Sequence, residues 1–271
     1  AGRLFVLPFG GAIGAMHAFG ADGRALNRQL AAELGLAEML VPGRAVNDVF
    51  AEYILQLSLL AMCIERVMTE AYTLIGQDFA ELGEALDPGA VGSSTMPQKV
   101  NPKYVVPVIA QAALLRGYAV SALETGRTSH EGDPVSNQLL TAVLDQAVPL
   151  AKKVTAGFAK ALDRLRVRRD RMAENLAAVG NAVSTENLMM VLAPIVGRGR
   201  AHDIVHHAIE TGGAAALFND PEITANLSDE QISTALNPAN YLGDSVSIAH
   251  AAAELATEVA AKLNRERAGG D

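Results

Sequence analysis

The sequence has no tryptophan, one cysteine and few aromatic residues, and its 30 acidic side chains outnumber its 22 basic ones. The net charge of −8 argues against non-specific binding to nucleic acid or to an anionic membrane. A single cysteine excludes an internal disulfide and is typical of a reducing compartment, so we expect a cytoplasmic protein. Cys63 lies among apolar residues, which predicts a thiol in the core. We find no apolar run of membrane-spanning length and no signal peptide, and we expect a soluble chain.

Half of the residues are hydrophobic, and they recur at helical spacing. Apolar positions fall at steps of three and four over residues 48–75, from Pro102 onward and over residues 135–165, which predicts three long helices. We expect Pro107 to kink or loosen the second helix. Helices of this length would be about 40 Å long at 1.5 Å per residue, longer than a compact monomer needs. Their apolar rows predict burial against other subunits.

The expected fold class is all-α, with two domains. Residues 1–165 would form a central long-helix bundle, and residues 166–271 a small all-helical C-terminal domain, because an arginine-rich stretch separates long helices from shorter ones broken by glycine and proline. Asp220 and Ser228 precede acidic residues and are expected to start helices in the second domain. His202 and His206 are spaced to share a metal, but no third ligand is evident, so we expect a surface or packing role and no metal.

Side chains suited to catalysis or to ligand binding are most concentrated in residues 92–103, which we term the serine loop. Gly92 gives backbone freedom, and the residues after it supply hydroxyl groups. Asn101 is expected to cap a helix that begins at Pro102, which would aim free backbone N–H groups and the Lys99 ammonium at a bound anion. The pattern indicates a carboxylate site that carries a nucleophilic or basic serine. A polar surface loop between two helices is the alternative.

The order of residues from Gly92 to Pro102 resembles the G-S-S-x-M-P-x-K-x-N-P loop of the aspartase/fumarase superfamily of lyases, and it matches at every fixed position. The resemblance implies an enzyme that makes or breaks a bond β to a substrate carboxylate without a cofactor. It also implies a homotetramer with a shared helical core, whose active sites combine segments from different subunits. Small carboxylates are therefore the expected substrates, and neither nucleic acid nor membrane is an expected partner.

The resemblance also implies roles for individual residues. Ser93 would be the general base, stabilised as an alkoxide by N–H groups and positive charge. The implied catalytic set is Ser93, Ser94 and Lys99, and the implied substrate-binding set is Thr95, Met96, Gln98, Asn101, Arg44 and His130. His130 lies in a polar connection, where Glu131 and Asp133 are expected to raise its pKa; a plain loop is the other interpretation.

Departures from the family pattern suggest one branch. Related fumarases, argininosuccinate lyases and adenylosuccinate lyases usually carry a glutamate where this chain has Val106, whereas the cycloisomerases acting on 3-carboxy-cis,cis-muconate are apolar there. Residues 227–243 are also similar to those of the cycloisomerases. The resemblance therefore favours a cycloisomerase-like protein, with the adenylosuccinate and argininosuccinate lyases as alternatives. Asn47 stands where the family usually has an anion-binding arginine, and Arg44 is a candidate to compensate.

The resemblance covers the second part of the sequence that members of the family usually have. The family's N-terminal domain, with its histidine motifs, has no counterpart in these residues. We therefore expect a truncated chain. Two hypotheses remain at this stage. One is a lyase or cycloisomerase that needs the missing segment, and the other is a non-catalytic helical assembly module that retains the loop.

Overall fold

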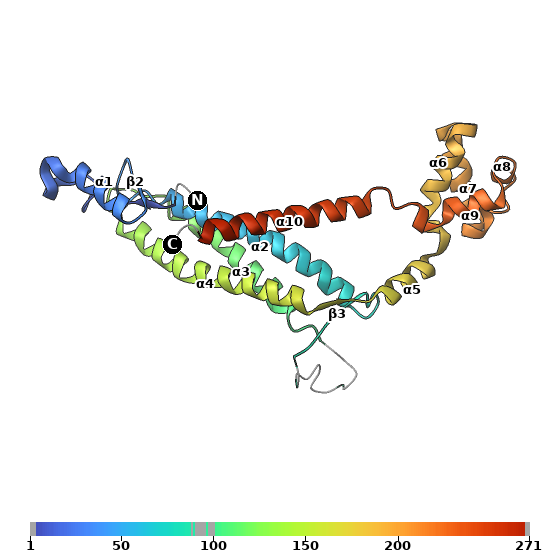
Figure 1. Ribbon diagram of the computed structural model, residues 1–271, viewed down its shortest axis with the longest axis horizontal. Helices are drawn as coiled ribbons and strands as arrows, with labels where there is room; N and C mark the ends of the chain where they lie inside the picture. Colours follow the sequence, from blue (N-terminus) through green and yellow to red (C-terminus); the bar gives the residue numbers. More distant parts are fainter. Residues whose placement is uncertain (1–3, 88, 90–95, 97–100, 269–271) are drawn as a thin grey trace. The chain divides into compact units, whose positions relative to one another are not determined.

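The computed structural model describes residues 4–87, 89, 96 and 101–268 (Figure 1). Helices dominate this part of the chain, which confirms the all-α prediction. The chain folds as two compact units, Ala1–Arg171 and Met172–Asp271, whereas the sequence placed the division after residue 165.

The elements of the first unit include three long helices and several short pieces. In chain order they are β1 (Val6–Leu7), the 3-10 helix η1 (His17–Asp22), α1 (Gly23–Glu33), β2 (Ala37–Glu38), α2 (Asp48–Ile75), β3 (Leu82–Glu84), α3 (Val105–Glu124), α4 (Pro134–Arg164) and β4 (Leu165–Val167). β1 pairs with β2 in parallel, and β3 pairs with β4 antiparallel. The observed α2 and α4 match the predicted helices over residues 48–75 and 135–165.

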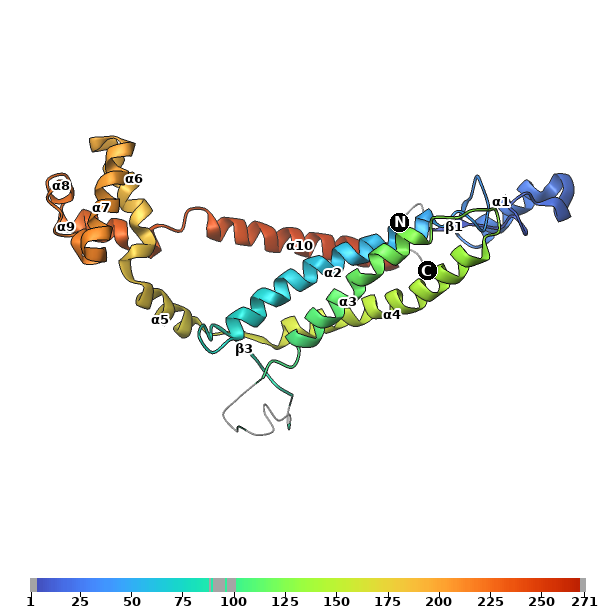
Figure 2. The same cartoon turned by 180° about the vertical axis from the view of Figure 1, so that it is seen from behind.

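Helices α2, α3 and α4 form an antiparallel bundle, in which they lie side by side (Figures 1 and 2). At one end, the start of α2 meets the end of α3 and the start of α4, because the Asn47 side chain bonds to Thr125 and Ser136. At the other end, β3 follows α2 and pairs with β4, which follows α4. The serine loop connects β3 to α3, so it belongs to this second end.

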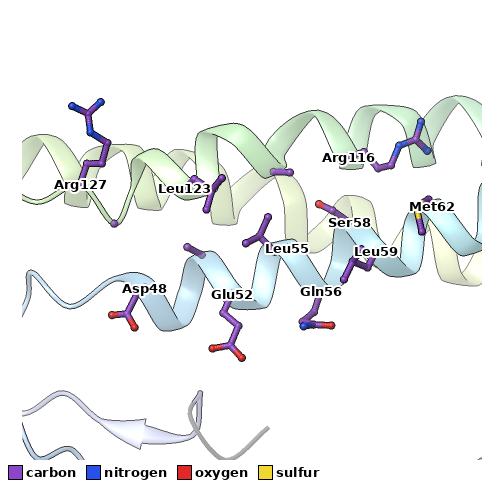
Figure 3. Close-up of a pocket in the computed structure, with 13 residues that line it drawn as sticks. Asp48, Glu52, Leu55, Gln56, Ser58, Leu59, Met62, Arg116, Leu123 and Arg127 are labelled. Atoms are coloured by element: carbon purple, nitrogen blue, oxygen red, sulfur yellow. The ribbon is translucent and has the colours of Figure 1, made fainter.

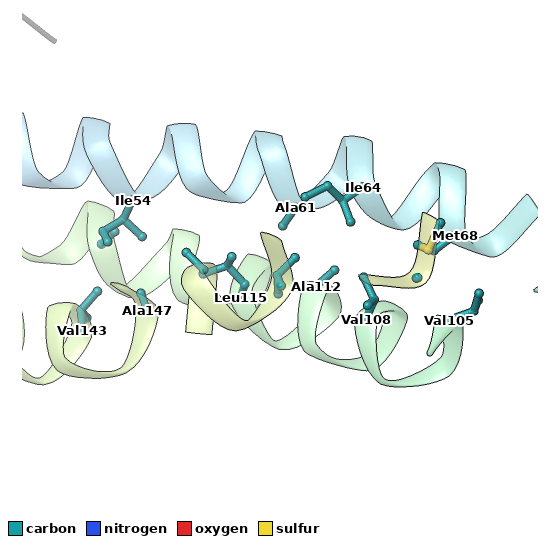
Figure 4. Packing of buried hydrophobic residues seen from close by; sticks show 14 of the residues in the cluster. Ile54, Ala61, Ile64, Met68, Val105, Val108, Ala112, Leu115, Val143 and Ala147 are labelled. Atoms are coloured by element: carbon teal, nitrogen blue, oxygen red, sulfur yellow. The ribbon is translucent and has the colours of Figure 1, made fainter. Parts of the chain in front are cut away.

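The core of the bundle is a row of aliphatic side chains interrupted by alanines (Figure 4). Ile54, Ala61 and Met68 of α2 face Ala112 and Leu115 of α3, and all five are almost completely buried. Alanine at the contacts allows the helix axes to approach, while the larger residues fill the space between them. The apolar residues that recur at steps of three and four in the sequence therefore lie on the buried faces of the helices.

Two expectations about the first unit are wrong. α3 begins at Val105 rather than at Pro102, so Pro107 falls in the first helical turn, where a missing N–H costs no intrahelical hydrogen bond, and α3 contains no break. Cys63 is exposed rather than buried. It lies on α2 between Ala61 and Ile64, which are the positions that face the core, so its own side chain points away from the core.

Helix α3 also differs from the expectation that no segment has membrane-spanning character. Within the described part of the chain it is long and apolar enough to cross a membrane by length and composition. It packs against both α2 and α4, and its Val105, Val108 and Leu115 are buried in the bundle core. These contacts are those of the central helix of a folded bundle.

The second unit is helical and has its own core. Its elements, beginning with a helix that spans the division, are α5 (Arg169–Val179), the 3-10 helix η2 (Gly180–Ser184), α6 (Thr185–Val196), α7 (Arg198–Ala216), α8 (Pro221–Thr224), α9 (Asp229–Leu236), the 3-10 helix η3 (Pro238–Asn240) and α10 (Ser245–Ala268). Leu188, Leu192, Leu217 and Ile232 are fully buried in this core. Along α10, apolar side chains such as Ile248 remain exposed.

Candidate active site

The serine loop emerges from the end of the bundle that β3 and the start of α3 share. Ser93, Ser94, Thr95, Gln98 and Lys99 lie outside the described residues. Met96 and Asn101 are described, and both are exposed. The structure therefore defines the two ends of the loop and the contacts that hold them.

Glu84 caps the N-terminus of α3, which corrects the expectation that Asn101 is the cap. Its carboxylate accepts hydrogen bonds from the backbone N–H groups of Lys103, Tyr104 and Val105, at 2.5, 3.1 and 2.8 Å. A carboxylate at this position satisfies N–H groups that have no intrahelical partner and interacts favourably with the helix dipole. The helix terminus that the sequence offered to a substrate anion is thus occupied by the protein's own carboxylate.

Asp87, which precedes the loop, forms ion pairs with the two nearby cations. Its carboxylate lies 2.6 Å from Nη2 of Arg164 and 3.4 Å from Nζ of Lys160. A hydrogen bond from the Tyr104 side chain is the largest cause that lowers the pKa of Asp87, and Lys160 and Arg164 lower it further. Lys160 also lies over the Tyr104 ring, with Nζ 4.9 Å from the centroid. These two cations are therefore neutralised by the protein.

The two other predicted site residues lie at the opposite end of the bundle. Arg44 precedes α2, and His130 lies between α3 and α4. Because α2 has 28 residues, the two ends are about 40 Å apart at 1.5 Å per residue. A single chain therefore does not bring Arg44 or His130 near Asp87 and Asn101, the described ends of its own serine loop.

His130 and Arg44 differ in their surroundings. The His130 side chain is 78% exposed, and its Nδ1 lies 3.0 Å from a carboxylate oxygen of Glu131. Arg44 lines a pocket of about 190 Å³ together with Asn137 and mainly apolar residues. Among the described residues, the Arg44 guanidinium has no hydrogen bond or ion pair, so it is available to an anion.

Asp133, which the sequence paired with His130, has a structural role instead. Its carboxylate accepts hydrogen bonds from the backbone of Ser129, Val135 and Ser136, and so caps α4. The bond from the Ser129 N–H is the largest cause that lowers the pKa of Asp133.

Asn47 belongs to the same end of the bundle, and its side chain is buried. Its Nδ2 lies 3.3 Å from both the Thr125 carbonyl oxygen and the Ser136 Oγ. This asparagine therefore ties the bundle end together, in a position where the family usually has an arginine.

A groove runs between α2 and α3 with a volume of about 890 Å³ (Figure 3). Leu55, Leu59, Met62 and Leu123 give it an apolar floor, and its rim carries charged residues such as Arg127. Leu59 and Met62 are about half exposed. This surface has the apolar composition of a helix-packing face.

The described residues contain no group of three or more histidine, cysteine, aspartate or glutamate side chains suited to a metal ion. His202 and His206 lie exposed on α7, with ring centroids 5.7 Å apart. Their placement on the surface agrees with the interpretation of the sequence.

Sequence reasoning did not find Glu84, Asp87 or Tyr104. Glu84 contacts residues about twenty positions away, and no local pattern marks such a contact. The one available signal is that two acidic residues stand shortly before a loop that carries Lys99.

Comparisons with known proteins agree with this architecture. Residues 1–115 match the family model described as Lyase, and residues 181–252 match the model for the adenylosuccinate lyase C-terminus. The chain is 30% identical over 258 residues to 3-carboxy-cis,cis-muconate cycloisomerase of Pseudomonas aeruginosa, covering 89% of this chain and 54% of that protein. It is also 30% identical over 250 residues to adenylosuccinate lyase of Methanothermobacter thermautotrophicus, covering 89% and 56%.

A solved structure shows the same fold. The 3-carboxy-cis,cis-muconate lactonizing enzyme of Pseudomonas putida superposes with a TM-score of 0.82 at 29% identity, covering 93% of this chain and 58% of that one. The chain spans a little over half the length of these relatives. From the loop pattern, the helical bundle and these matches together, the chain belongs to the aspartase/fumarase superfamily of lyases.

Proposed function

We propose that this chain supplies the serine loop of a lyase or cycloisomerase whose substrate resembles 3-carboxy-cis,cis-muconate. The loop pattern from Gly92 to Pro102 is the observation that carries the proposal, because Ser93, Lys99 and Asn101 together serve chemistry rather than packing. The Pseudomonas cycloisomerase and lactonizing enzyme support this branch.

In this proposal, Ser93 exchanges a proton with the carbon next to a substrate carboxylate. In the lactonising direction, an oxygen of one carboxylate adds to a double bond, and the neighbouring carbon takes the proton of the Ser93 hydroxyl. Solvent then returns a proton to the serine oxygen. Negative charge spreads onto the adjacent carboxylate between these steps, so stabilisation by positive charge lowers the barrier. Lys99 and Asn101 hold that carboxylate, with Ser94, Thr95, Met96 and Gln98 as further contacts.

The remaining contacts come from other copies of the chain. Arg44 and His130 lie about 40 Å from the described ends of the loop along the bundle of their own chain, as estimated from the length of α2. Another copy packed along the bundle brings its Arg44 end to this serine loop. A homotetramer with a shared helical core is therefore part of the proposal, and the half-exposed apolar residues of the α2–α3 groove support it.

An adenylosuccinate lyase-like reaction is the second candidate. The match of residues 181–252 to the adenylosuccinate lyase C-terminus favours it. An argininosuccinate lyase-like reaction has less support, since it rests on the superfamily loop alone.

Ultraviolet turnover assays test the proposal. The purified protein is assayed with 3-carboxy-cis,cis-muconate, adenylosuccinate, argininosuccinate and fumarate, and the Ser93→Ala and Ser233→Ala variants are compared. Ser233 is an exposed residue of α9 and serves as the matched control. We expect turnover of 3-carboxymuconate that falls by about 100-fold or more in Ser93→Ala, the usual contribution of a general acid or base, and is unchanged in Ser233→Ala.

Turnover of adenylosuccinate in place of 3-carboxymuconate would establish the second candidate. Absence of turnover with every substrate would contradict an active lyase and favour a helical assembly module.

A further inference from the structure

We infer that Glu84, Asp87 and Tyr104 are positioning residues for the serine loop. We call these three residues the loop clamp. The inference rests on the proposed function for its kinetic consequence, while its structural part concerns described residues alone. None of the three is expected to touch the substrate.

Tyr104 is the centre of the loop clamp because it contacts Glu84 directly and Asp87 through two cations. Its backbone N–H donates to Glu84 at 3.1 Å. Its ring centroid lies 4.9 Å from Nζ of Lys160 and 5.9 Å from Cζ of Arg164, and both cations bind the Asp87 carboxylate. Glu84 and Asp87 precede the loop, whereas Tyr104 follows it. The clamp therefore joins the entrance of the loop to its exit at two separate points.

The clamp is itself attached to the bundle. Glu84 belongs to β3 and lies opposite Leu165 of β4. The next residue, Ala85, donates its N–H to the Arg164 carbonyl oxygen at 2.8 Å, and the Arg164 side chain binds Asp87. Both ends of the loop are thus fixed to the ends of α3 and α4, as expected of a catalytic loop on a rigid scaffold.

The charges of the clamp also determine which groups can bind substrate. Glu84 occupies the α3 terminus, and Asp87 neutralises Lys160 and Arg164. Binding of a substrate carboxylate at this end therefore depends on groups within the loop, such as Lys99. Correct placement of the loop then decides the rate, because small displacements of a reacting group are costly.

The Tyr104→Leu variant tests the kinetic part, since it removes the ring that Lys160 covers and keeps an apolar side chain. Tyr118→Leu is the matched control, because Tyr118 lies on α3, which Tyr104 precedes, and both rings pack against the core. We expect kcat to fall about tenfold or more in Tyr104→Leu with KM nearly unchanged, the pattern of an interaction lost mainly in the transition state. Glu84→Gln, which keeps an acceptor oxygen, should retain more activity than Glu84→Ala. Equal kcat values for Tyr104→Leu and Tyr118→Leu would overturn the inference.

A second measurement does not require turnover. Trypsin can cleave after Lys103, whose N–H is held by Glu84, only when the start of α3 opens. We expect cleavage at this bond to be about fivefold faster or more in Tyr104→Leu and Glu84→Ala than in Tyr118→Leu, in proportion to the increased open population. Unchanged cleavage would overturn the clamp. Faster cleavage in a protein without turnover would uphold the clamp and contradict the proposed function.

Discussion

Asp133 shows how a single carboxylate stabilises a junction between helices. Its pKa is lowered because it accepts backbone hydrogen bonds, the largest effect coming from Ser129. A lowered folded pKa means that the charged form stabilises the fold above the unfolded value near 4, and that this contribution is lost as the pH falls through the folded pKa.

We therefore expect Asp133→Asn to be less stable than the unmodified protein at neutral pH, with the difference shrinking below about pH 4. Urea unfolding between neutral and acid pH measures this difference. Asparagine retains a capping oxygen, so the comparison isolates the charge. A difference that grows toward acid pH would contradict the assignment.

At the residue scale, local contacts were easier to predict than distant ones. Asp220 and Ser228 were expected to start helices, and both do: Asp220 accepts from the Ile223 N–H, and Ser228 forms a capping box with Gln231. The cap of α3 was assigned to Asn101 because only local candidates are visible in a sequence. Glu84 provides that cap through a contact that exists only after β3 has folded against α3.

At the scale of elements, the bundle core depends on the fit between α2 and α3. Leu115 is almost completely buried in this core, whereas Leu26 on α1 is 39% exposed. We expect Leu115→Ala to lower the free energy of unfolding by about 2–5 kcal/mol, since it removes buried methyl groups and leaves a cavity. Leu26→Ala should cost less than about 1 kcal/mol. Chemical denaturation measures the free energy of unfolding of both variants. Similar decreases for Leu115→Ala and Leu26→Ala would contradict a central role for Leu115 in the bundle core.

Helix periodicity predicted α2 and α4 closely, because long amphipathic patterns contain many concordant positions. The start of α3 was less predictable, since Pro102 and Pro107 are both acceptable near a helix start. Cys63 was misjudged for a related reason. Its neighbours in sequence are apolar, but on a bundle helix only one face is buried within the chain, and the remaining apolar residues stay exposed.

At the scale of the whole molecule, the α2–α3 groove is the surface expected to bind other copies. Leu59→Lys places a charge on its apolar floor, and Leu34→Lys places the same charge on an exposed leucine outside it. We expect Leu59→Lys to shift the protein from tetramer toward smaller species in sedimentation velocity, because an unpaired charge in an apolar interface is costly. Leu34→Lys should sediment like the unmodified protein. A monomeric unmodified protein would contradict the shared bundle.

The sequence indicated the family and the helical class, and both are confirmed. Its linear pattern predicts roles for Ser93 and Lys99, which stay predictions, and it does not give the geometry of a complete site. The structure adds that Arg44 and His130 lie at the far end of the same bundle. Their distance from the described ends of the loop follows from the length of α2, which is why the proposed site combines more than one copy.

The central claim is that the serine loop of one copy works with the Arg44 end of another. Its most direct test is to mix two variants, Ser93→Ala and Arg44→Gln, and to measure turnover of the substrate that the unmodified protein accepts. We predict that each variant alone is inactive or nearly so and that subunit exchange restores on the order of a quarter of the activity, since random pairing in a symmetric oligomer rebuilds that share of intact sites. A mixture that exchanges subunits and stays inactive would contradict a site shared between copies.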